Sequence, residues 1–188
     1  MWEDNLLPHN FYKLFYFLAY ISEKREYQNL RHLRKGQITM VIKDFSKDLF
    51  YLDNTFPFPV EHEGIVYDSL AAAFVAAKTD VEAQRRAISH MDFYQANFYF
   101  KEHCRTSKDF TAHKKEIFLT LFHEKFDKNE DDYLVRILES TTGRNDTFIY
   151  ENTECDNFLG VCTCSKCKGR RGENLLGIAL TELRRKYE

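Results

Sequence analysis

Apolar side chains recur three or four residues apart in several segments, which is the spacing of an amphipathic helix. Residues 9–34, 111–126, 133–138 and 176–183 share this spacing, and we predict a helix over each. The 111–126 segment has the clearest apolar face, formed by Ile117, Phe118, Leu121, Phe122 and Phe126. The chain is therefore predicted to be mostly helical.

A further helix is predicted to begin at Asp68-Ser69, because both residue types are common helix N-caps. It runs to Lys78 and is expected to continue to about Ile88. Alanines near its start would let neighbouring elements pack closely against it. The next segment, 91–103, is rich in aromatic residues, and its pattern favours neither a helix nor a strand.

Short runs of β-branched and aromatic residues predict strands at 38–43, 49–52, 64–67 and 147–151. The strands do not alternate regularly with helices, which disfavours a doubly wound sheet. We predict an α+β fold, a mostly helical single domain with a small β-sheet.

The composition is that of a folded domain with a polar surface. Hydrophobic residues make up 44% of the chain, with 17 phenylalanines and 11 tyrosines, which is not typical of disorder. A formal net charge of -2 argues against a nucleic-acid binder with a broad basic face. No apolar run reaches the ~18 residues of a membrane span, and Glu3 and Asp4 replace the basic start of a secretory signal. We therefore expect a cytoplasmic protein without a membrane partner.

Two segments contain candidate reactive groups. Lys78 ends the alanine-rich helix, and a lysine of lowered pKa can act as a nucleophile and form Schiff bases with aldehydes. The alternative is a solvated surface lysine, which the spacing alone favours. Glu151 and Asp156 lie in a polar segment after a predicted strand, where ligand contacts are common. A polar turn explains the same residues.

One of the five cysteines, Cys104, stands apart, and the other four lie close together: Cys155, Cys162, Cys164 and Cys167. In a reducing compartment such a cluster indicates a metal site more than disulfides. Cys164 and Cys167 have the C-x2-C spacing of many zinc ligands, and the other two could complete a tetrahedral site. Most structural zinc sites join two separated pairs, so reduced thiols in a loop are the alternative.

Asn174 stands at the start of the last predicted helix, where its side chain could cap the helix. The same N-terminus could hold a phosphate or pyrophosphate. Neither G-x-G-x-x-G nor G-x-x-x-x-G-K-[ST] occurs in the chain, so a phosphate would have to bind without a glycine-rich loop.

Several segments match, in order, the motifs of one known family. Tyr51–Val60 (YLDNTFPFPV) is similar to F-L-S-N-F-Y-P-x-P, and Gly64–Tyr67 is similar to the G-x-x-Y/W that follows it. Ser69–Lys78 (SLAAAFVAAK) is similar to S/T-x-E-x-x-[FY]-Q-A-x-K, and His113–Phe126 is similar to a helix that ends in K-F.

The C-terminal part continues the match. Tyr150–Gly160 is similar to V-E-x-x-x-x-D-x-x-W-G, and Gly172–Arg184 is similar to G-x-N-x-L-G-x-x-L-x-x-[VL]-R. Over about residues 44–187 the chain thus resembles the NADAR (NAD- and ADP-ribose-associated) family, also called YbiA-like. The resemblance implies a YbiA-like domain over residues 38–188, preceded by a helical extension over residues 1–37.

The resemblance also implies an activity and its partners. It implies hydrolysis of N-glycosidic bonds in ADP-ribose-type conjugates, such as ADP-ribosyl-guanine, or in related N-ribosides. The implied partners are ADP-ribose or another NAD-derived nucleotide, and ADP-ribosylated nucleic acid. Such a hydrolase requires no cofactor, and a structural zinc ion remains a separate hypothesis for the cysteines.

Individual residues take roles from this resemblance. Lys78 matches the family lysine, which implies a nucleophile or Schiff-base former toward C1 of ribose, with Glu151 and Asp156 as further catalytic candidates. The positions implied to contact the ligand are Asn54, Tyr67, Phe74, Phe110, Phe158, Gly160 and Asn174.

Departures from the motifs bear on the activity. The Glu of the family's helix motif falls on Ala71 and its Gln falls on Val75, while the tryptophan of W-G falls on Leu159. A carboxylate beside the lysine would be the natural acid or base, so its replacement implies weakened hydrolysis, in which Glu151 or Asp156 takes its place. The alternative is a non-catalytic module that binds and sequesters a NAD-derived nucleotide.

Overall fold

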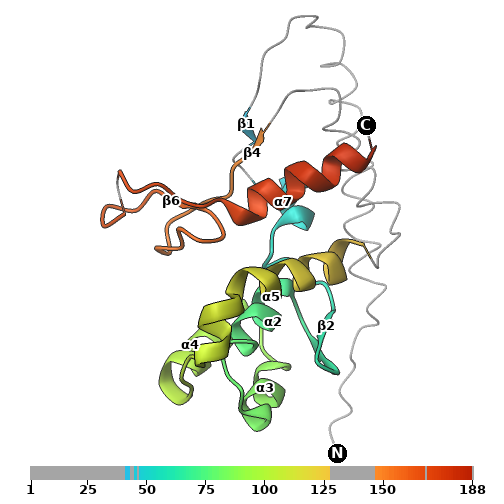
Figure 1. Ribbon diagram of the computed structural model, residues 1–188, viewed down its shortest axis with the longest axis vertical. Helices are drawn as coiled ribbons and strands as arrows, with labels where there is room; N and C mark the ends of the chain where they lie inside the picture. The colour runs from blue at the N-terminus through green and yellow to red at the C-terminus, as the bar shows by residue number, and fades with distance from the viewer. Residues whose placement is uncertain (1–40, 43–44, 46, 128–146, 168, 188) are drawn as a thin grey trace, which may run out of the picture. The chain divides into compact units, whose positions relative to one another are not determined.

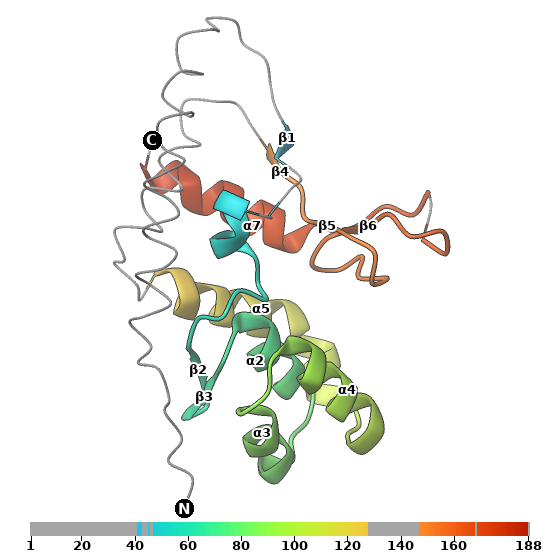
Figure 2. The ribbon, with the colours of Figure 1, turned by 180° about the vertical axis from the view of Figure 1, so that it is seen from behind.

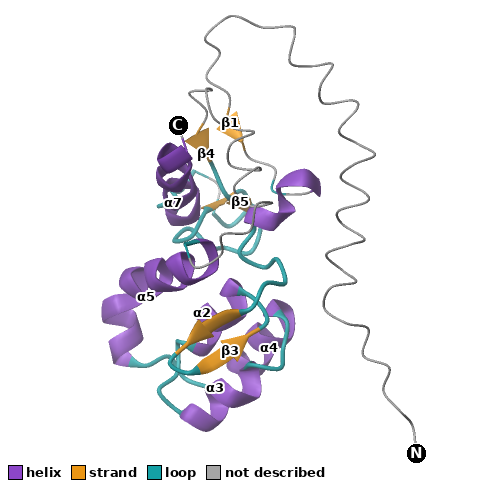
Figure 3. Cartoon of the chain, turned by 90° about the vertical axis from the view of Figure 1, so that its right-hand side faces the viewer, coloured by secondary structure: helices purple, strands orange, loops and turns teal. Residues whose placement is uncertain are grey.

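The computed structural model describes residues 41–42, 45, 47–127, 147–167 and 169–187 (Figure 1). The helices predicted over 9–34 and 133–138, and the N-terminal extension over 1–37, lie outside the described residues. Helices make up most of the described chain, and its strands are short (Figure 3). The predicted α+β class with a predominance of helix is confirmed.

Helix α2, Leu70–Ala76, begins as predicted at Ser69, whose Oγ accepts a hydrogen bond from the backbone N–H of Ala72 at 3.2 Å. All of its residues are buried, and it contacts α3, α4 and α5 (Figure 2). The helix ends at Ala76 and does not continue to Ile88 as predicted. A separate helix α3, Glu82–Ile88, follows.

The break between α2 and α3 is stabilised by Thr79. Its hydroxyl donates to Gln84 Oε1 at 2.6 Å and accepts from the backbone N–H of Val81 at 3.2 Å. These bonds give the backbone an alternative to continued helix. The break places Lys78 in a connecting turn instead of on a helix surface.

Two longer helices follow. Helix α4, Phe93–His103, occupies the aromatic segment, and a capping box between Asp92 and Gln95 starts it. Helix α5, Lys108–Phe126, begins earlier than its apolar pattern suggested, because Ser107 Oγ accepts from the backbone N–H of Phe110 at 3.0 Å. Its inward face matches the predicted one except for Ile117, which is only half-buried.

The strands form three two-stranded sheets among the described residues. Strand β1 (Val41–Ile42) pairs in parallel with β4 (Thr147–Phe148), and β5 (Glu151–Asn152) pairs in parallel with β6 (Val161–Cys162). Strand β2 (Val60–His62) pairs antiparallel with β3 (Ile65–Tyr67).

A turn at Glu63 and Gly64, with φ of 50° and 74°, joins β2 to β3. Positive φ at both central residues is the geometry of a tight hairpin turn whose twist suits the strands. The strand predicted at 49–52 is wrong, since Lys47–Leu52 forms a 3-10 helix, η1. Its end is closed by a local bond from the N–H of Asp53 to the carbonyl of Phe50 at 3.0 Å, and Leu52 turns into the core.

Helix α7, Leu175–Arg184, contacts β4 and is followed by a 3-10 helix, η2, at Arg185–Tyr187. One apolar core joins residues of η1, α2, α4, α5 and α7. Within the described residues, none of the helices combines the length and the apolar character needed to cross a bilayer.

Candidate functional site

Lys78 is the centre of the candidate site. Its backbone carbonyl accepts from the N–H of Ser107 at 2.8 Å, which ties the turn after α2 to the start of α5. The side chain is half-buried, and its Nζ lies 5.5 Å from the ring centroid of Phe100 on α4. Burial lowers the pKa of the Lys78 amine, Asp156 raises it, and Lys101 lowers it further. The amine thus loses its proton more readily than a solvated lysine does.

Asp156, in the loop between β5 and β6, lies close enough to Lys78 for its charge to act on the amine. Its Oδ1 accepts from the backbone N–H groups of Phe158 at 2.8 Å and Leu159 at 2.9 Å. Its own carbonyl accepts from the Asn152 side chain at 2.7 Å. These bonds fix the carboxylate within a tight turn. The structure therefore brings together two residues that sequence reasoning proposed as catalytic from distant parts of the chain.

Aromatic rings form one wall of the site. Phe74 of α2 lies 5.3 Å from Phe110 of α5 and stacks on Phe158 at 6.2 Å, with the ring planes 11° apart. All three residues were predicted ligand contacts, and the fold assembles them. Phe74 and Phe110 are buried, whereas Phe158 is half-buried.

Lys114 is a further residue of this wall that sequence reasoning missed. Its Nζ lies 4.1 Å from the ring centroid of Phe158, a cation–π contact. A signal was present in the sequence, because Phe110 and Lys114 are four residues apart and so share one face of α5. The wall therefore offers both an aromatic face and a cation to a ligand.

A polar pair, the buried Asn54 and the half-buried Tyr150, lies next to the Asp156 loop. The hydroxyl of Tyr150 donates to Asn54 Oδ1 at 3.3 Å, and the Asn54 carbonyl accepts from the N–H of Ala71 at 2.8 Å. Burial raises the pKa of the Tyr150 phenol, and the nearby Asp53 and Asp156 carboxylates raise it further. The phenol is therefore a neutral hydrogen-bonding group at physiological pH. Tyr150 was also missed, although it opens one of the family motifs.

The side chain of Asn174 does not cap α7, as its position suggested, but bonds to backbone groups of another segment. Its backbone is left-handed, with φ of 54°, and its side chain makes no capping bond to α7. Instead its Oδ1 accepts from the N–H of Tyr150 at 2.9 Å, and its Nδ2 donates to the carbonyl of Phe148 at 2.9 Å. The side chain thereby ties α7 to the strand region that carries Tyr150. Its predicted ligand contact stays a prediction.

Gly160 lies where two backbone segments meet. A Cβ built there would come within 2.2 Å of the Tyr150 carbonyl oxygen and 2.9 Å of Asn152 Nδ2. The Gly160 carbonyl also accepts from the N–H of Asn174 at 3.3 Å. This close approach explains the glycine by packing, while its predicted ligand contact is not tested.

Replacing Gly160 by alanine is expected to lower the free energy of unfolding by about 3 kcal/mol, because the methyl group meets backbone that cannot move aside. Gly64→Ala is the matched control: no atom lies within 4 Å of its Cβ, so only its φ of 74° opposes the change, at about 1 kcal/mol. Urea unfolding of both variants measures the difference. Equal losses would show that crowding at Gly160 is absent.

Tyr67 and Glu151 lie on two different strands. Tyr67 is buried on β3, its hydroxyl has no hydrogen-bond partner among the described residues, and the charged groups acting on it include Arg85 and Glu63. Burial raises its pKa to about 12. Glu151 is half-buried on β5, opposite Val161 of β6. Their predicted roles at the Lys78 site remain predictions.

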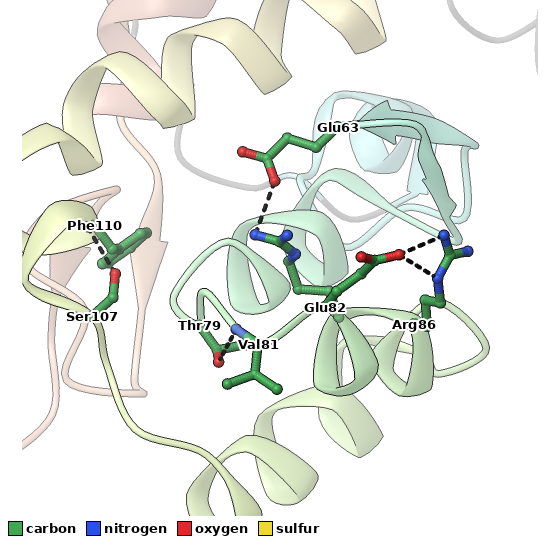
Figure 4. Close-up of polar contacts among 8 residues, drawn as sticks. Glu63, Thr79, Val81, Glu82, Arg86, Ser107 and Phe110 are labelled. Atoms are coloured by element: carbon green, nitrogen blue, oxygen red, sulfur yellow. Dashed lines mark hydrogen bonds and ion pairs between the residues drawn. The ribbon is translucent and has the colours of Figure 1, made fainter.

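A cavity of about 150 Å³ lies beside the Lys78 turn. Ala77 and Thr79 line it but Lys78 does not. The rest of the lining combines polar groups of β2–β3, α3 and α5 with the apolar side chains of Phe110 and Ile117. Among them, Arg85 forms an ion pair with Glu63 at 2.9 Å (Figure 4). The cavity and the aromatic wall thus share Phe110, which lines both.

The four cysteines near residue 160 gather into one group, the cysteine cluster: Cys155, Cys162, Cys164 and Cys167. Their Sγ atoms all lie within 4.8 Å of one another, close enough for shared coordination of a metal ion. The shortest separation given by the structure is 3.3 Å, between Cys155 and Cys164. Hydrogen bonds from Cys162 and Cys155 lower the pKa of the Cys164 thiol to about 6.

The fold has a solved counterpart. The NMR structure of the E. coli protein YbiA aligns with this chain at a TM-score of 0.59 and 20% sequence identity, covering 81% of this chain and 89% of the other. No family model matches the sequence, and no curated protein matches it at a significant level. The chain thus has a YbiA-like fold, as the order of its motifs predicted.

Proposed function

We propose that this protein cleaves the N-glycosidic bond of an ADP-ribose-type conjugate and that Lys78 attacks C1 of the ribose. The observation that carries the proposal is the setting of the Lys78 amine. It is partly withdrawn from water, its pKa is lowered, and it lies near Asp156 and the ring of Phe100. A lysine in such surroundings is a stronger nucleophile at neutral pH than a solvated one.

The proposed reaction has two steps. The neutral Lys78 amine attacks C1, the bond from C1 to the base nitrogen breaks, and the departing nitrogen takes up the proton that the amine loses. The lysine-bound sugar then opens to an imine, which water hydrolyses to release the sugar and restore the amine. The fixed negative charge of Asp156 stabilises the positive charge that develops around C1.

The aromatic wall supplies the recognition. The half-buried Phe158 is the ring proposed to contact a planar base, and stacking of a base on an aromatic ring is worth about 1–3 kcal/mol in nucleic-acid binding. Lys114 beside this ring, and Lys101 near Lys78, are the cations expected to meet the pyrophosphate. A nucleotide is therefore held at both ends, with its ribose near the amine.

Reductive trapping tests the proposal. The full chain is incubated with ADP-ribosylated guanosine, and chromatography is expected to detect ADP-ribose and guanosine. Borohydride added during turnover reduces the imine, so peptide mass mapping should find the sugar adduct on Lys78. Product without this adduct, or adducts spread evenly over exposed lysines, would rule out the covalent mechanism.

One observation favours a second candidate, a module that binds the nucleotide without cleaving it. Ala71 and Val75, at the positions of the family's Glu and Gln, are only 1% and 2% exposed. The inward positions on α2 are thus filled by apolar groups, and no carboxylate stands there to transfer a proton. Calorimetric binding of ADP-ribose together with an absence of product would support this candidate.

A further inference from the structure

We propose that the cysteine cluster binds one zinc ion and that this ion fixes the loop carrying Asp156 and Phe158. Four thiolates around zinc, each about 2.3 Å from the metal, lie about 3.8 Å from one another. The cluster's sulfur atoms, all within 4.8 Å of one another, need only small shifts to reach this arrangement. Four protein ligands close the tetrahedron, so the zinc is structural and leaves no position for a reacting water.

The burial of the cluster supports a metal. Cys162 and Cys167 are only 4% and 3% exposed, yet neither belongs to the apolar core formed by the described residues. Small segments without a core of their own commonly depend on a metal or on cross-links for their order.

The surroundings of the cluster suit a metal–thiolate centre. The backbone N–H of Cys164 donates to the Cys162 sulfur at 3.4 Å, a bond that favours the thiolate. Zinc with four thiolates carries a net charge of about -2, since each thiolate contributes one negative charge. The exposed Lys166, Arg170 and Arg171 in the adjoining sequence offset this charge.

The cluster is joined to the candidate site through the chain. Cys155 directly precedes Asp156, whose carboxylate holds the backbone of Phe158 at 2.8 Å. The backbone N–H of Cys162 donates to Asn157 Oδ1 at 3.0 Å, which closes the loop from its other side. A metal at the cluster therefore restrains both ends of the segment that places Phe158 against the aromatic wall. The role of zinc in positioning Phe158 rests on the proposed function. Zinc binding by the four cysteines does not depend on that function.

Metal analysis of the full chain is the first test. Protein purified with zinc and dialysed is expected to contain one zinc ion per chain by elemental analysis. Replacement of zinc by cobalt should give the strong visible absorption of a tetrahedral cobalt–thiolate centre. The proposal would be overturned if the reduced protein, after reconstitution, held less than about 0.1 zinc per chain. It would also be overturned if a Cys155–Cys164 disulfide formed to the same extent in the presence of zinc as in its absence.

Two serine variants sharpen the result. Cys164→Ser should weaken zinc binding by at least about tenfold, as measured by competition with a chromogenic chelator. Cys104→Ser removes a thiol outside the cluster and should leave the zinc content unchanged. Equal affinities in the two variants would show that the cluster is not the metal site.

Hydrogen exchange tests the link to the loop without any activity measurement. Removal of zinc by a chelator should speed backbone exchange across residues 152–160 by about tenfold or more, while exchange in α5 stays unchanged. The Cys104→Ser protein should respond in the same way. If zinc leaves and exchange over residues 152–160 does not change, the positioning role is wrong, whatever the outcome of the cleavage assay.

Discussion

Lys78→Met is expected to slow cleavage of ADP-ribosylated guanosine by at least about 10³-fold, because methionine cannot attack C1 or form an imine. The methionine side chain is unbranched and only one heavy atom shorter than lysine, so it still packs beside Phe100. Removing a partly desolvated charge should leave the free energy of unfolding equal or slightly higher. Steady-state assays, together with urea unfolding of the same protein preparation, separate loss of chemistry from loss of fold.

Two further variants distinguish a Lys78 that acts as a nucleophile from a Lys78 that acts only through its positive charge. Lys78→Arg keeps a positive charge but provides no amine that can form an imine, so it should be as inactive as Lys78→Met. Lys115→Met removes an exposed lysine on the same helix as Lys114 and should retain the full rate. A Lys78→Arg protein with the activity of the unmodified chain would limit Lys78 to an electrostatic role.

The pH dependence follows from the same group. The attacking form is the neutral amine, so the rate should rise with pH through the pKa of Lys78 and then level off. Burial lowers that pKa, so the plateau is reached below the range of a solvated lysine. Covalent trapping should follow the same curve.

The sequence predicted those parts of the fold that depend on local signals. The N-cap at Ser69, the apolar face of α5 and the hairpin strand before α2 all arise from residues close together in the chain. The end of α2 was missed, since alanine and glutamine continue its helical pattern and only the bonds made by Thr79 interrupt it. The sequence predicts a strand where residues 47–52 form a 3-10 helix, because apolar side chains alone do not distinguish the two.

The candidate site was predictable to a lesser degree. Motif order selected Lys78, Asp156 and Phe158, and the fold brings them into one region. Lys114 was missed because its role depends on packing between α5 and a loop more than forty residues away. At Asn174 the motif suggested a ligand contact or a helix cap. In the structure its side chain instead joins α7 to the strand region at Phe148 and Tyr150.

Lys125 is a buried lysine on α5 whose charge should make the stability of the protein depend on pH. It is 1% exposed, and its Nζ donates to the backbone carbonyl of Asp53 at 2.6 Å. The ring of Phe126 lies 4.9 Å from the same nitrogen. Burial lowers the pKa of Lys125 to about 7, and the Asp53 carboxylate acts in the opposite direction.

Comparison of the unmodified protein with Lys125→Met should reveal this titration. Between pH 7 and 10.5 the unfolded chain holds a proton on Lys125 that the folded chain has lost, so folding is favoured as pH rises. Relative to the variant, the unmodified protein should gain about 1.4 kcal/mol of unfolding free energy per pH unit in this window. Below pH 7 both states are protonated and the difference becomes constant. Urea unfolding of both proteins at a series of pH values measures this difference in unfolding free energy. The other groups titrate alike in the two proteins, so they do not contribute to the difference. Parallel curves of unfolding free energy against pH would mean that Lys125 stays charged in the folded protein.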